Sequence, residues 1–299
     1  MTAPDASKEP TGLALYSRSA EAACNTVIAA YSTSFGWATK LFSAPMRQPI
    51  RNIYAMVRVA DEIVDGAAAE AAKRGGTVVP GQALDAFEAE VYEAIEAGFS
   101  ANLVAHAFAI TAREYGISRE LIAPFFASMR ADLTQTVHDQ PSFERYIYGS
   151  AEVVGLMCLK VFIAHGKRLY STDEIRALET SACALGSAFQ KVNFLRDISA
   201  DFNSLGRSYF PGVLVSNFTD AERDRIVAEI DGEIAIAKAA LRNLPPSVRR
   251  AVYASLLLFE ALNRKISGTA AVELASRRIR VSNGRKLLLV LRACLPMSE

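Results

Sequence analysis

Residues Gln190 to Asp201 read QKVNFLRDISAD, and their polar side chains recur at intervals of three and four. This interval matches the 3.6-residue turn of an α-helix, so these side chains fall along one face. The positions on this face are Gln190, Asn193, Asp197 and Asp201. Because valine, phenylalanine, leucine and isoleucine lie between them, the stretch predicts a largely apolar helix that carries two carboxylates four residues apart.

A second pair of carboxylates occurs far upstream, in the stretch YAMVRVADEIVD from Tyr54 to Asp65. Tyr54, Arg58, Asp61 and Asp65 follow the same helical spacing. Ionised neighbours at this spacing repel each other by about 0.2–0.5 kcal/mol on an exposed helix. Burial increases the cost, because an unpaired carboxylate in an apolar environment either takes up a proton or needs a cation. One such pair is typical of a solvated helix, whereas two pairs, each beside an arginine in an apolar helix, indicate a metal site.

Magnesium is the ion that this donor set favours, with Mn²⁺ as the alternative. Mg²⁺ prefers oxygen ligands and usually binds through one or two carboxylates together with phosphate oxygens of a substrate. Two facing pairs can therefore hold a diphosphate through metal bridges. Arg58, Arg196 and Arg207 add positive charge that can contact phosphate oxygens directly. The alternative for each arginine is a salt bridge to a neighbouring aspartate.

The rest of the chain predicts an all-α protein, because alternating runs of β-branched residues are scarce and apolar residues recur every three or four positions. Expected helices span residues 19–42, 48–66, 81–97, 101–115, 119–138, 142–168, 172–202, 219–243, 246–267 and 269–296. Thr219 and Glu222 form an expected capping box, and loops are expected at 66–81 and 203–212.

Composition favours one folded domain. The chain has 299 residues, of which 51% are hydrophobic and 22% charged, and no long linker rich in glycine, serine or proline divides it. We expect a flexible N-terminus over residues 1–18, followed by a single domain over residues 19–299. A formal net charge of +1 gives no electrostatic reason to expect a nucleic-acid partner.

Cysteine, histidine and hydropathy patterns exclude several further classes. The four cysteines form no CxxC motif and are expected to be reduced, and the three histidines lack the spacing of a zinc site. No run approaches the roughly 20 apolar residues of a membrane span. We therefore expect a cytoplasmic protein. The apolar and basic stretch RKLLLVLRACL, Arg285 to Leu295, predicts either a terminal core helix or transient contact with a membrane surface.

Four stretches together resemble the squalene and phytoene synthase family, whose members join two prenyl diphosphates head to head. They are YSTSF at 31–35, YAMVRVADEIVD at 54–65, YIYGSAEVVGLM at 146–157 and QKVNFLRDISADF at 190–202. The resemblance extends from about Tyr31 to the C-terminal helices. It implies an isoprenoid-synthase fold, in which a bundle of helices surrounds a deep apolar cavity with both aspartate motifs at its mouth.

The resemblance also implies a role for individual residues. Magnesium ligands would be Asp61, Asp65, Asn193, Asp197 and Asp201. Diphosphate contacts would be Ser32, Ser34, Arg58, Arg196 and Arg207. Tyr146 matches a tyrosine implicated in proton transfer, and Phe35, Tyr54, Gly155 and Gln190 would line the cavity. For Gly155, close approach of two helices is the alternative.

Three positions depart from the family pattern. Ala200 stands where an acidic residue is frequent, Glu152 where a small residue is frequent, and Phe259 in place of a tyrosine that contacts the second diphosphate. None of these changes removes one of the four aspartates. A charge at Glu152 would need a partner or exposure.

The expected activity is condensation of two geranylgeranyl diphosphates to phytoene, in carotenoid biosynthesis, through a cyclopropyl diphosphate. This reaction would require no NADPH. Squalene or dehydrosqualene synthesis from farnesyl diphosphate is the nearest alternative, and squalene formation would require NADPH. A terpene cyclase and a non-catalytic helical assembly or binding protein are alternatives of other kinds. The sequence leaves the oligomeric state open.

Overall fold

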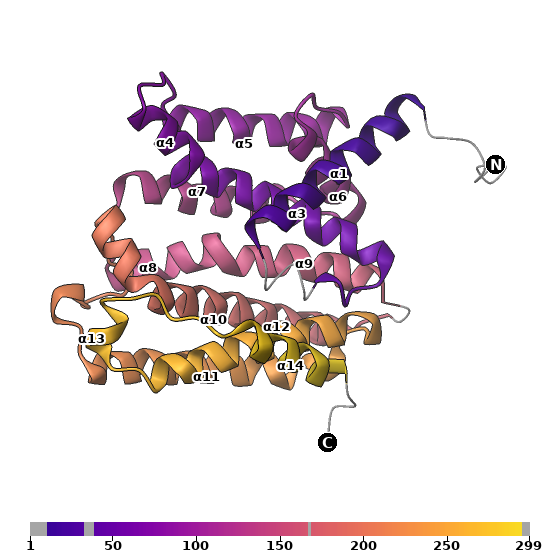
Figure 1. Ribbon diagram of the computed structural model, residues 1–299. Helices are drawn as coiled ribbons and strands as arrows, with labels where there is room; N and C mark the ends of the chain where they lie inside the picture. The colour runs from indigo at the N-terminus through magenta and orange to yellow at the C-terminus, as the bar shows by residue number, and fades with distance from the viewer. Residues whose placement is uncertain (1–10, 33–38, 167–168, 295–299) are drawn as a thin grey trace.

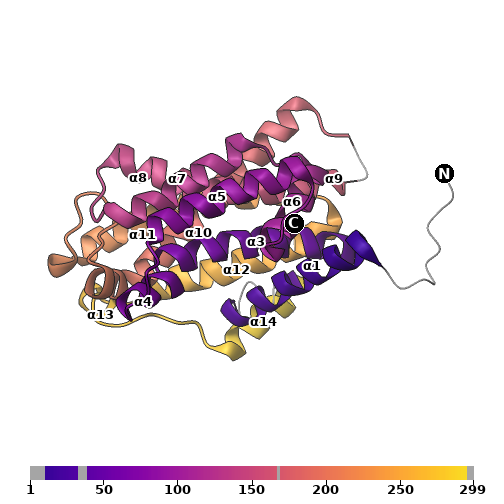
Figure 2. The ribbon, with the colours of Figure 1, turned by 90° about the horizontal axis from the view of Figure 1, so that it is seen from above.

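A computed structural model describes residues 11–32, 39–166 and 169–294, and the side chains of residues 201–205 and Val215 are also left out. Over these residues the protein is all-α: helices form every regular element, and one isolated bridge pairs Val137 with Ser208. The axes of most long helices are roughly aligned, whichever way the chain runs along them, and the helices are stacked in layers (Figures 1 and 2).

Six helices of the first half form the upper layers in Figure 1. They are α1 (Gly12–Tyr31), α3 (Ala44–Val64), α4 (Ala67–Lys73), α5 (Pro80–Ala97), α6 (Leu103–Tyr115) and α7 (Arg119–Thr134). Helix α3 contacts α1, α5, α6 and α7, so its apolar face is enclosed on several sides. This enclosure places the first aspartate motif at the end of a core helix.

The second half supplies the lower layers. They contain α8 (Gln140–Ile147), the π-helical turn η1 (Tyr148–Glu152), α9 (Val153–Ala164), α10 (Thr172–Leu205), α11 (Asp220–Ala239), α12 (Pro246–Ser267), α13 (Ala271–Leu274) and α14 (Asn283–Cys294), with short 3₁₀ turns η2 (Val215–Asn217) and η3 (Leu241–Asn243). Helix α10 contacts α9, α11 and α12. It therefore lies in the interior and carries the second aspartate motif there.

Residues 140–164 form one continuous helical rod through α8, η1 and α9. By length and composition it is the one helix of the described chain able to cross a membrane. It packs against α3, α7 and α10 inside the bundle, where apolar residues contribute to the core. Several of its apolar residues nevertheless stay partly accessible, among them Val154, Leu156 and Cys158.

The π-helical turn packs against α7 at Gly149. A β-carbon at Gly149 would lie 2.2 Å from both the Pro124 carbonyl oxygen and Ser128 Oγ, so only glycine fits without moving a helix. We expect Gly149→Ala to lower the free energy of unfolding by about 1–3 kcal/mol, the usual cost of overpacking. Denaturant unfolding followed by circular dichroism measures this change.

Gly232 on α11 is a matched control, because no atom lies within 4 Å of a β-carbon built there. Alanine is a better helix former than glycine, so Gly232→Ala is expected to raise stability by about 0.5–1 kcal/mol. Equal effects of the two substitutions would contradict the close approach at Gly149.

Several expected boundaries are wrong. Helix α1 begins at Gly12 instead of residue 19 and ends at Tyr31, and α4 lies inside the expected loop 66–81. Helix α10 extends to Leu205, into the expected loop 203–212. The expected helix 269–296 is also wrong, because a turn at residues 275–277 and a non-helical segment at 278–282 separate α13 from α14. The capping box is confirmed: Thr219 Oγ1 accepts a hydrogen bond from the Glu222 N–H, and Glu222 Oε2 accepts one from the Thr219 N–H.

Candidate active site

The first motif lies at the C-terminal end of α3. Arg58 Nη1 donates a hydrogen bond to Asp61 Oδ2 at 3.1 Å, and Arg58 also pairs with Glu62. The Arg58 guanidinium lies 4.3 Å from the centre of the Tyr31 ring, a cation–π distance. These contacts fix the arginine beside the carboxylate and show a salt bridge within its own motif, whereas a contact between Arg58 and phosphate stays a prediction.

Asp61 combines exposure with surrounding protein. Its side chain is 46% exposed, yet burial raises the pKa of its carboxyl to about 6, with Asp65 raising it and Arg58 and Arg207 opposing the rise. A group that is both accessible to water and enclosed by protein lies in a concave part of the surface. Such a carboxylate is suited to receive a cation.

Asp65 and Arg207 join the first motif to the segment that follows α10. Arg207 Nη2 and Nη1 donate hydrogen bonds to Asp65 Oδ1 and Oδ2 at 2.6 and 2.7 Å, a bidentate pair. Burial alone would lower the pKa of Arg207, but its hydrogen bonds to Asp65 and the charge of Asp132 raise it instead. The guanidinium therefore remains charged although its side chain is only 7% exposed.

Asp132 on α7 is a residue that sequence reasoning missed. Its carboxylate accepts hydrogen bonds from Tyr146 Oη at 2.6 Å and from Tyr209 Oη at 3.1 Å, and its carbonyl oxygen accepts one from Arg207 Nη2 at 2.5 Å. Burial raises the pKa of this carboxyl to about 7, while Arg207 and the hydrogen bond from Tyr146 oppose the rise. A sequence signal did exist, because Asp132 stands three and seven residues after Met129 and Phe125, on the buried face of its helix.

The second motif is held by two arginines. Arg196 Nε donates to Asp197 Oδ1 at 3.0 Å, and Arg278 Nε lies 2.7 Å from the same oxygen. Sequence reasoning predicted Arg196 and missed Arg278, which belongs to the non-helical segment 278–282. The alternation Arg278-Ile279-Arg280-Val281, in which Ile279 and Val281 are buried, was the signal against a helix here.

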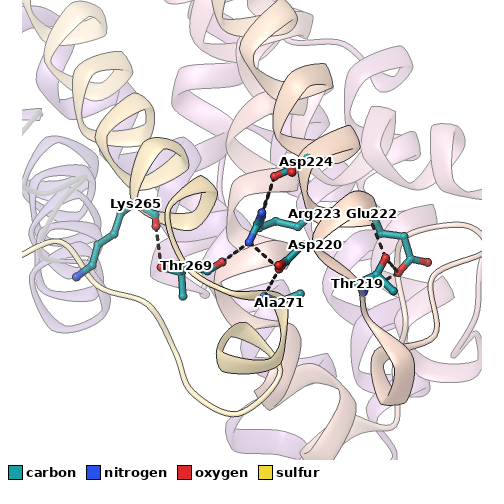
Figure 3. Close-up of polar contacts among 8 residues, drawn as sticks. All are labelled: Thr219, Asp220, Glu222, Arg223, Asp224, Lys265, Thr269 and Ala271. Atoms are coloured by element: carbon teal, nitrogen blue, oxygen red, sulfur yellow. Dashed lines mark hydrogen bonds and ion pairs between the residues drawn. The ribbon is translucent and has the colours of Figure 1, made fainter.

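Figure 3 shows how a polar cluster anchors the chain just before this segment. Arg223 Nη1 donates hydrogen bonds to Asp220 Oδ1 and to the Thr269 carbonyl oxygen, and the Ala271 N–H donates to the same Asp220 oxygen. Lys265 Nζ donates to the carbonyl oxygen of Arg280 at 2.8 Å, within the non-helical segment 278–282 itself. Contacts on α11 and α12 therefore place Arg278 over Asp197.

Asn193 fits the role of an oxygen ligand. Its Oδ1 is buried and has no hydrogen-bond partner among the described residues, so this oxygen is free to bind a cation. Together with Asp61, Asp65 and Asp197 it forms a set of hard oxygen donors, which is the set that Mg²⁺ prefers. Among the described side chains, no three acidic, histidine or cysteine residues converge on one point, and the Asp201 side chain is not described.

The remaining predicted site residues lie on the same helices or outside the description. Tyr54 and Gln190 are partly exposed on α3 and α10, and burial raises the pKa of Tyr54, with Arg58 and a hydrogen bond to Ser32 opposing. Ser34 and Phe35 lie outside the described residues. A β-carbon at Gly155 would lie 2.7 Å from the Ala182 carbonyl oxygen, so this glycine allows α9 to approach α10 closely. A substrate contact at Gly155 stays a prediction.

Two of the departures from the family pattern have visible partners. Burial raises the pKa of Glu152, a shift opposed by a hydrogen bond with Cys183 and by the charge of Lys191. The Phe259 ring stacks on Phe189 with centroids 3.7 Å apart, so this phenylalanine packs between α10 and α12. Glu152 therefore has polar partners in the bundle, and Phe259 has an aromatic one.

The sequence profile of the squalene/phytoene synthase family matches residues 28–285. The chain belongs to the squalene/phytoene synthase family and is a prenyltransferase-type enzyme.

Two curated relatives cover nearly the whole chain. The phytoene synthase of Arthrospira platensis is 26% identical over 296 residues, covering 92% of this chain and 91% of its own. The 15-cis-phytoene synthase of Synechocystis is 28% identical over 284 residues, covering 89% of this chain and 81% of its own.

Solved structures share the fold at lower identity. A dehydrosqualene synthase has a TM-score of 0.75 at 18% identity, covering 94% of this chain and 97% of its own. The squalene synthase from Alicyclobacillus acidocaldarius has a TM-score of 0.70 at 18% identity, covering 89% and 97%. These likenesses confirm the predicted isoprenoid-synthase fold.

Proposed function

We propose that this enzyme condenses two geranylgeranyl diphosphates head to head to phytoene, in carotenoid biosynthesis. The observation that carries the proposal is that both carboxylate motifs hold paired arginines at the ends of core helices, in a chain whose curated relatives over most of its length are phytoene synthases. Guanidinium groups beside hard oxygen donors are suited to bind a diphosphate through a divalent metal.

The polar residues act on the leaving group. Asp61, Asp65, Asn193 and Asp197 would hold Mg²⁺, with Asp201 as a further ligand. When bound, the metal supplies positive charge that stabilises the departing diphosphate. Arg58, Arg196, Arg207 and Arg278 contact phosphate oxygens, and each exchanges its carboxylate partner for phosphate as the substrate binds.

Apolar residues protect the cation that ionisation leaves behind. Val154, Leu156 and Cys158 are partly accessible although their helix lies inside the bundle, and burial raises the pKa of the Cys158 thiol to about 12. This combination is expected for side chains that line an internal apolar cavity. Such a lining excludes water, which would otherwise capture the carbocation as an alcohol.

The chemistry then requires one C–C bond and the loss of one proton. The allylic cation alkylates the double bond of the second prenyl diphosphate, and loss of a proton closes a cyclopropane ring. Tyr146 on α8 is the proton-transfer residue in this proposal. A second ionisation, a rearrangement and a final proton loss give the linear hydrocarbon.

The assay incubates purified protein with Mg²⁺ and either geranylgeranyl or farnesyl diphosphate, with and without NADPH. A C40 hydrocarbon with a central conjugated triene, formed from geranylgeranyl diphosphate without NADPH, supports phytoene synthesis. A C30 product from farnesyl diphosphate moves the assignment to squalene or dehydrosqualene synthesis, which the solved structures of that branch make the second candidate. A cyclic product from one diphosphate indicates a terpene cyclase, and no product with either substrate favours a non-catalytic role.

Arg278 provides a test of diphosphate binding. We expect Arg278→Met to lower kcat/KM by about 10–100-fold, because a hydrogen bond to a charged group contributes about 1.5–3 kcal/mol. Arg277→Met is the matched control, since the Arg277 side chain is 69% exposed and pairs with Glu273 on the neighbouring turn. Steady-state kinetics with varied prenyl diphosphate measures both. Equal losses in the two variants would contradict the role of Arg278.

We also propose that α14 contacts an anionic membrane surface. Three of its leucines are exposed by 49%, 67% and 55%, at positions Leu287, Leu288 and Leu291. The helix contains basic residues and no acidic ones, which complements anionic lipid. Its opposite side packs on α12 through Ala293, so the helix is held in place.

Vesicle binding tests this surface. Replacing both Leu288 and Leu291 by serine is expected to reduce cosedimentation with anionic vesicles about tenfold or more, because each buried leucine contributes about 1.5–3 kcal/mol. Leu169→Ser is the control, since Leu169 is 98% exposed in a different segment. If the double variant binds the vesicles as well as the wild-type protein does, α14 does not contact the membrane.

A further inference from the structure

Asp132 is a buried carboxylate that the mechanism above does not use. Only 7% of the residue is exposed, and its two carboxylate oxygens accept hydrogen bonds from two phenols: Oδ2 from Tyr146 at 2.6 Å and Oδ1 from Tyr209 at 3.1 Å. Burying a carboxylate is costly unless its charge is compensated. The burial of the Asp132 carboxylate therefore needs a structural or functional explanation.

Compensation of the Arg207 charge does not by itself explain why Asp132 is buried. The guanidinium already forms a bidentate pair with Asp65, at 2.6 and 2.7 Å, whereas its nearest approach to the Asp132 carboxylate is 3.6 Å. Two carboxylates thus face one guanidinium. Burial raises the pKa of the Asp132 carboxyl to about 7, so this group can take up a proton near neutral pH.

Tyr146 is the residue placed to deliver that proton. Burial and the Asp132 charge raise the pKa of the Tyr146 phenol well above 10, so it stays protonated at neutral pH. A neutral phenol removes a proton from another molecule effectively only if it releases its own proton at the same time. The acceptor at 2.6 Å from Tyr146 Oη is Asp132 Oδ2.

The other groups around this pair do not offer the same route. Tyr209 also hydrogen-bonds Tyr146, but its phenol donates its own proton to Asp132 Oδ1, and Arg207 carries donors and no acceptor. The His138 ring stacks on Tyr209 with centroids 5.8 Å apart and lies 5.1 Å from the Tyr146 ring, and burial lowers the pKa of His138. The short hydrogen bond that Tyr146 Oη donates therefore identifies Asp132 as the acceptor of its proton.

We propose that Asp132 is the proton acceptor that allows Tyr146 to act as a base, an inference that rests on the proposed function. In the cyclopropane-closing step a C–H bond of the substrate breaks and its electron pair forms the third ring bond. The proton moves to Tyr146 Oη, and the proton of Tyr146 moves to Asp132 Oδ2. Asp132 acts through Tyr146 and does not touch the substrate.

Asp132→Asn tests this relay, because asparagine keeps the size and an acceptor oxygen but cannot take up the proton. We expect release of inorganic diphosphate to persist within about tenfold, while the cyclopropyl diphosphate and the hydrocarbon fall by about 10²–10⁴-fold, the usual contribution of general acid–base catalysis. Prenyl alcohol should replace them, since water captures the cation. Tyr146→Phe is expected to show the same partition, and the double variant should be no worse than either single one.

Tyr115→Phe removes a phenol that hydrogen-bonds His165 Nε2 at 3.0 Å, away from Asp132 and Tyr146, so it should keep the wild-type ratio of alcohol to cyclopropyl product. Hydrocarbon formation by Asp132→Asn within threefold of wild type, or parallel loss of diphosphate release and hydrocarbon, would overturn the relay. If Asp132→Asn does not fold, an unchanged product ratio in Tyr146→Phe overturns it instead. Failure of the wild-type protein to form any hydrocarbon would refute the proposed function itself.

Discussion

Replacing Asp197 by asparagine is expected to abolish measurable hydrocarbon formation, with a loss of about 10³-fold or more. Asp197 is the described carboxylate of the second motif, and the substitution removes the negative charge that would hold a divalent cation at the leaving diphosphate. Metal-assisted charge stabilisation contributes several kcal/mol in a transition state, and about 10²–10³-fold in rate is lost when a single preorganised donor is removed. Asp61→Asn is expected to have a similar effect.

This loss should arise without unfolding. Arg196 and Arg278 would lose their partner in Asp197→Asn, but their side chains are 23% and 48% exposed, so water can solvate them. Asp173→Asn on the same helix is the control, because Asp173 is 92% exposed and pairs with Arg176 three residues on. Product assays over a Mg²⁺ titration, with thermal unfolding in parallel, distinguish the two variants. Retention of more than a tenth of wild-type activity by Asp197→Asn would refute its role in metal binding.

The two aspartate motifs could be predicted from the sequence because their information is local. Helical spacing of three and four residues puts Asp61 beside Arg58 and Asp197 on the same face as Asn193, and both helices were confirmed in type. The same logic gave the capping box at Thr219. Patterns of this kind depend on neighbours within one or two turns, which the sequence displays directly.

The contacts that the sequence did not predict join distant segments. Arg207 pairs with Asp65 across 142 positions, Tyr209 with Asp132 across 77 and Arg278 with Asp197 across 81. No local spacing encodes such a pairing. The sequence analysis predicts helix across residues 278–282, which the structure leaves non-helical, although the alternation Arg278-Ile279-Arg280-Val281 has a period of two.

A buried ion cluster between α10 and α11 gives the second large expected effect. Lys191, whose side chain is 7% exposed, pairs with Glu229 and with Glu233, and Ser187 Oγ donates a hydrogen bond to Glu233 Oε1 at 2.7 Å. The second oxygen of Glu233 is buried without a partner among the described residues. Lys191 therefore compensates a carboxylate that is only 18% exposed.

We expect Lys191→Met to lower the free energy of unfolding by about 3 kcal/mol at pH 8, at the low end of the about 3–5 kcal/mol for breaking a buried pair, because Glu233 keeps some contact with water. Lys238→Met is the control: Lys238 pairs with Glu260 at 2.9 Å with exposures of 39% and 24%, so its loss should cost less than about 1 kcal/mol. Urea denaturation of both variants measures the difference.

The pH dependence of this loss identifies its cause. Burial already raises the pKa of Glu233 above 4.5, while the hydrogen bond and charge of Lys191 oppose the rise, so removing Lys191 raises this pKa further. The folded variant then binds a proton more tightly than the unfolded chain, which makes its stability fall as pH rises through the folded-state pKa and recover as pH is lowered. Lys191→Met should therefore lose clearly less stability at pH 5 than at pH 8. An equal loss at both values would mean that Lys191 contributes through packing of its aliphatic chain, and not by compensating Glu233.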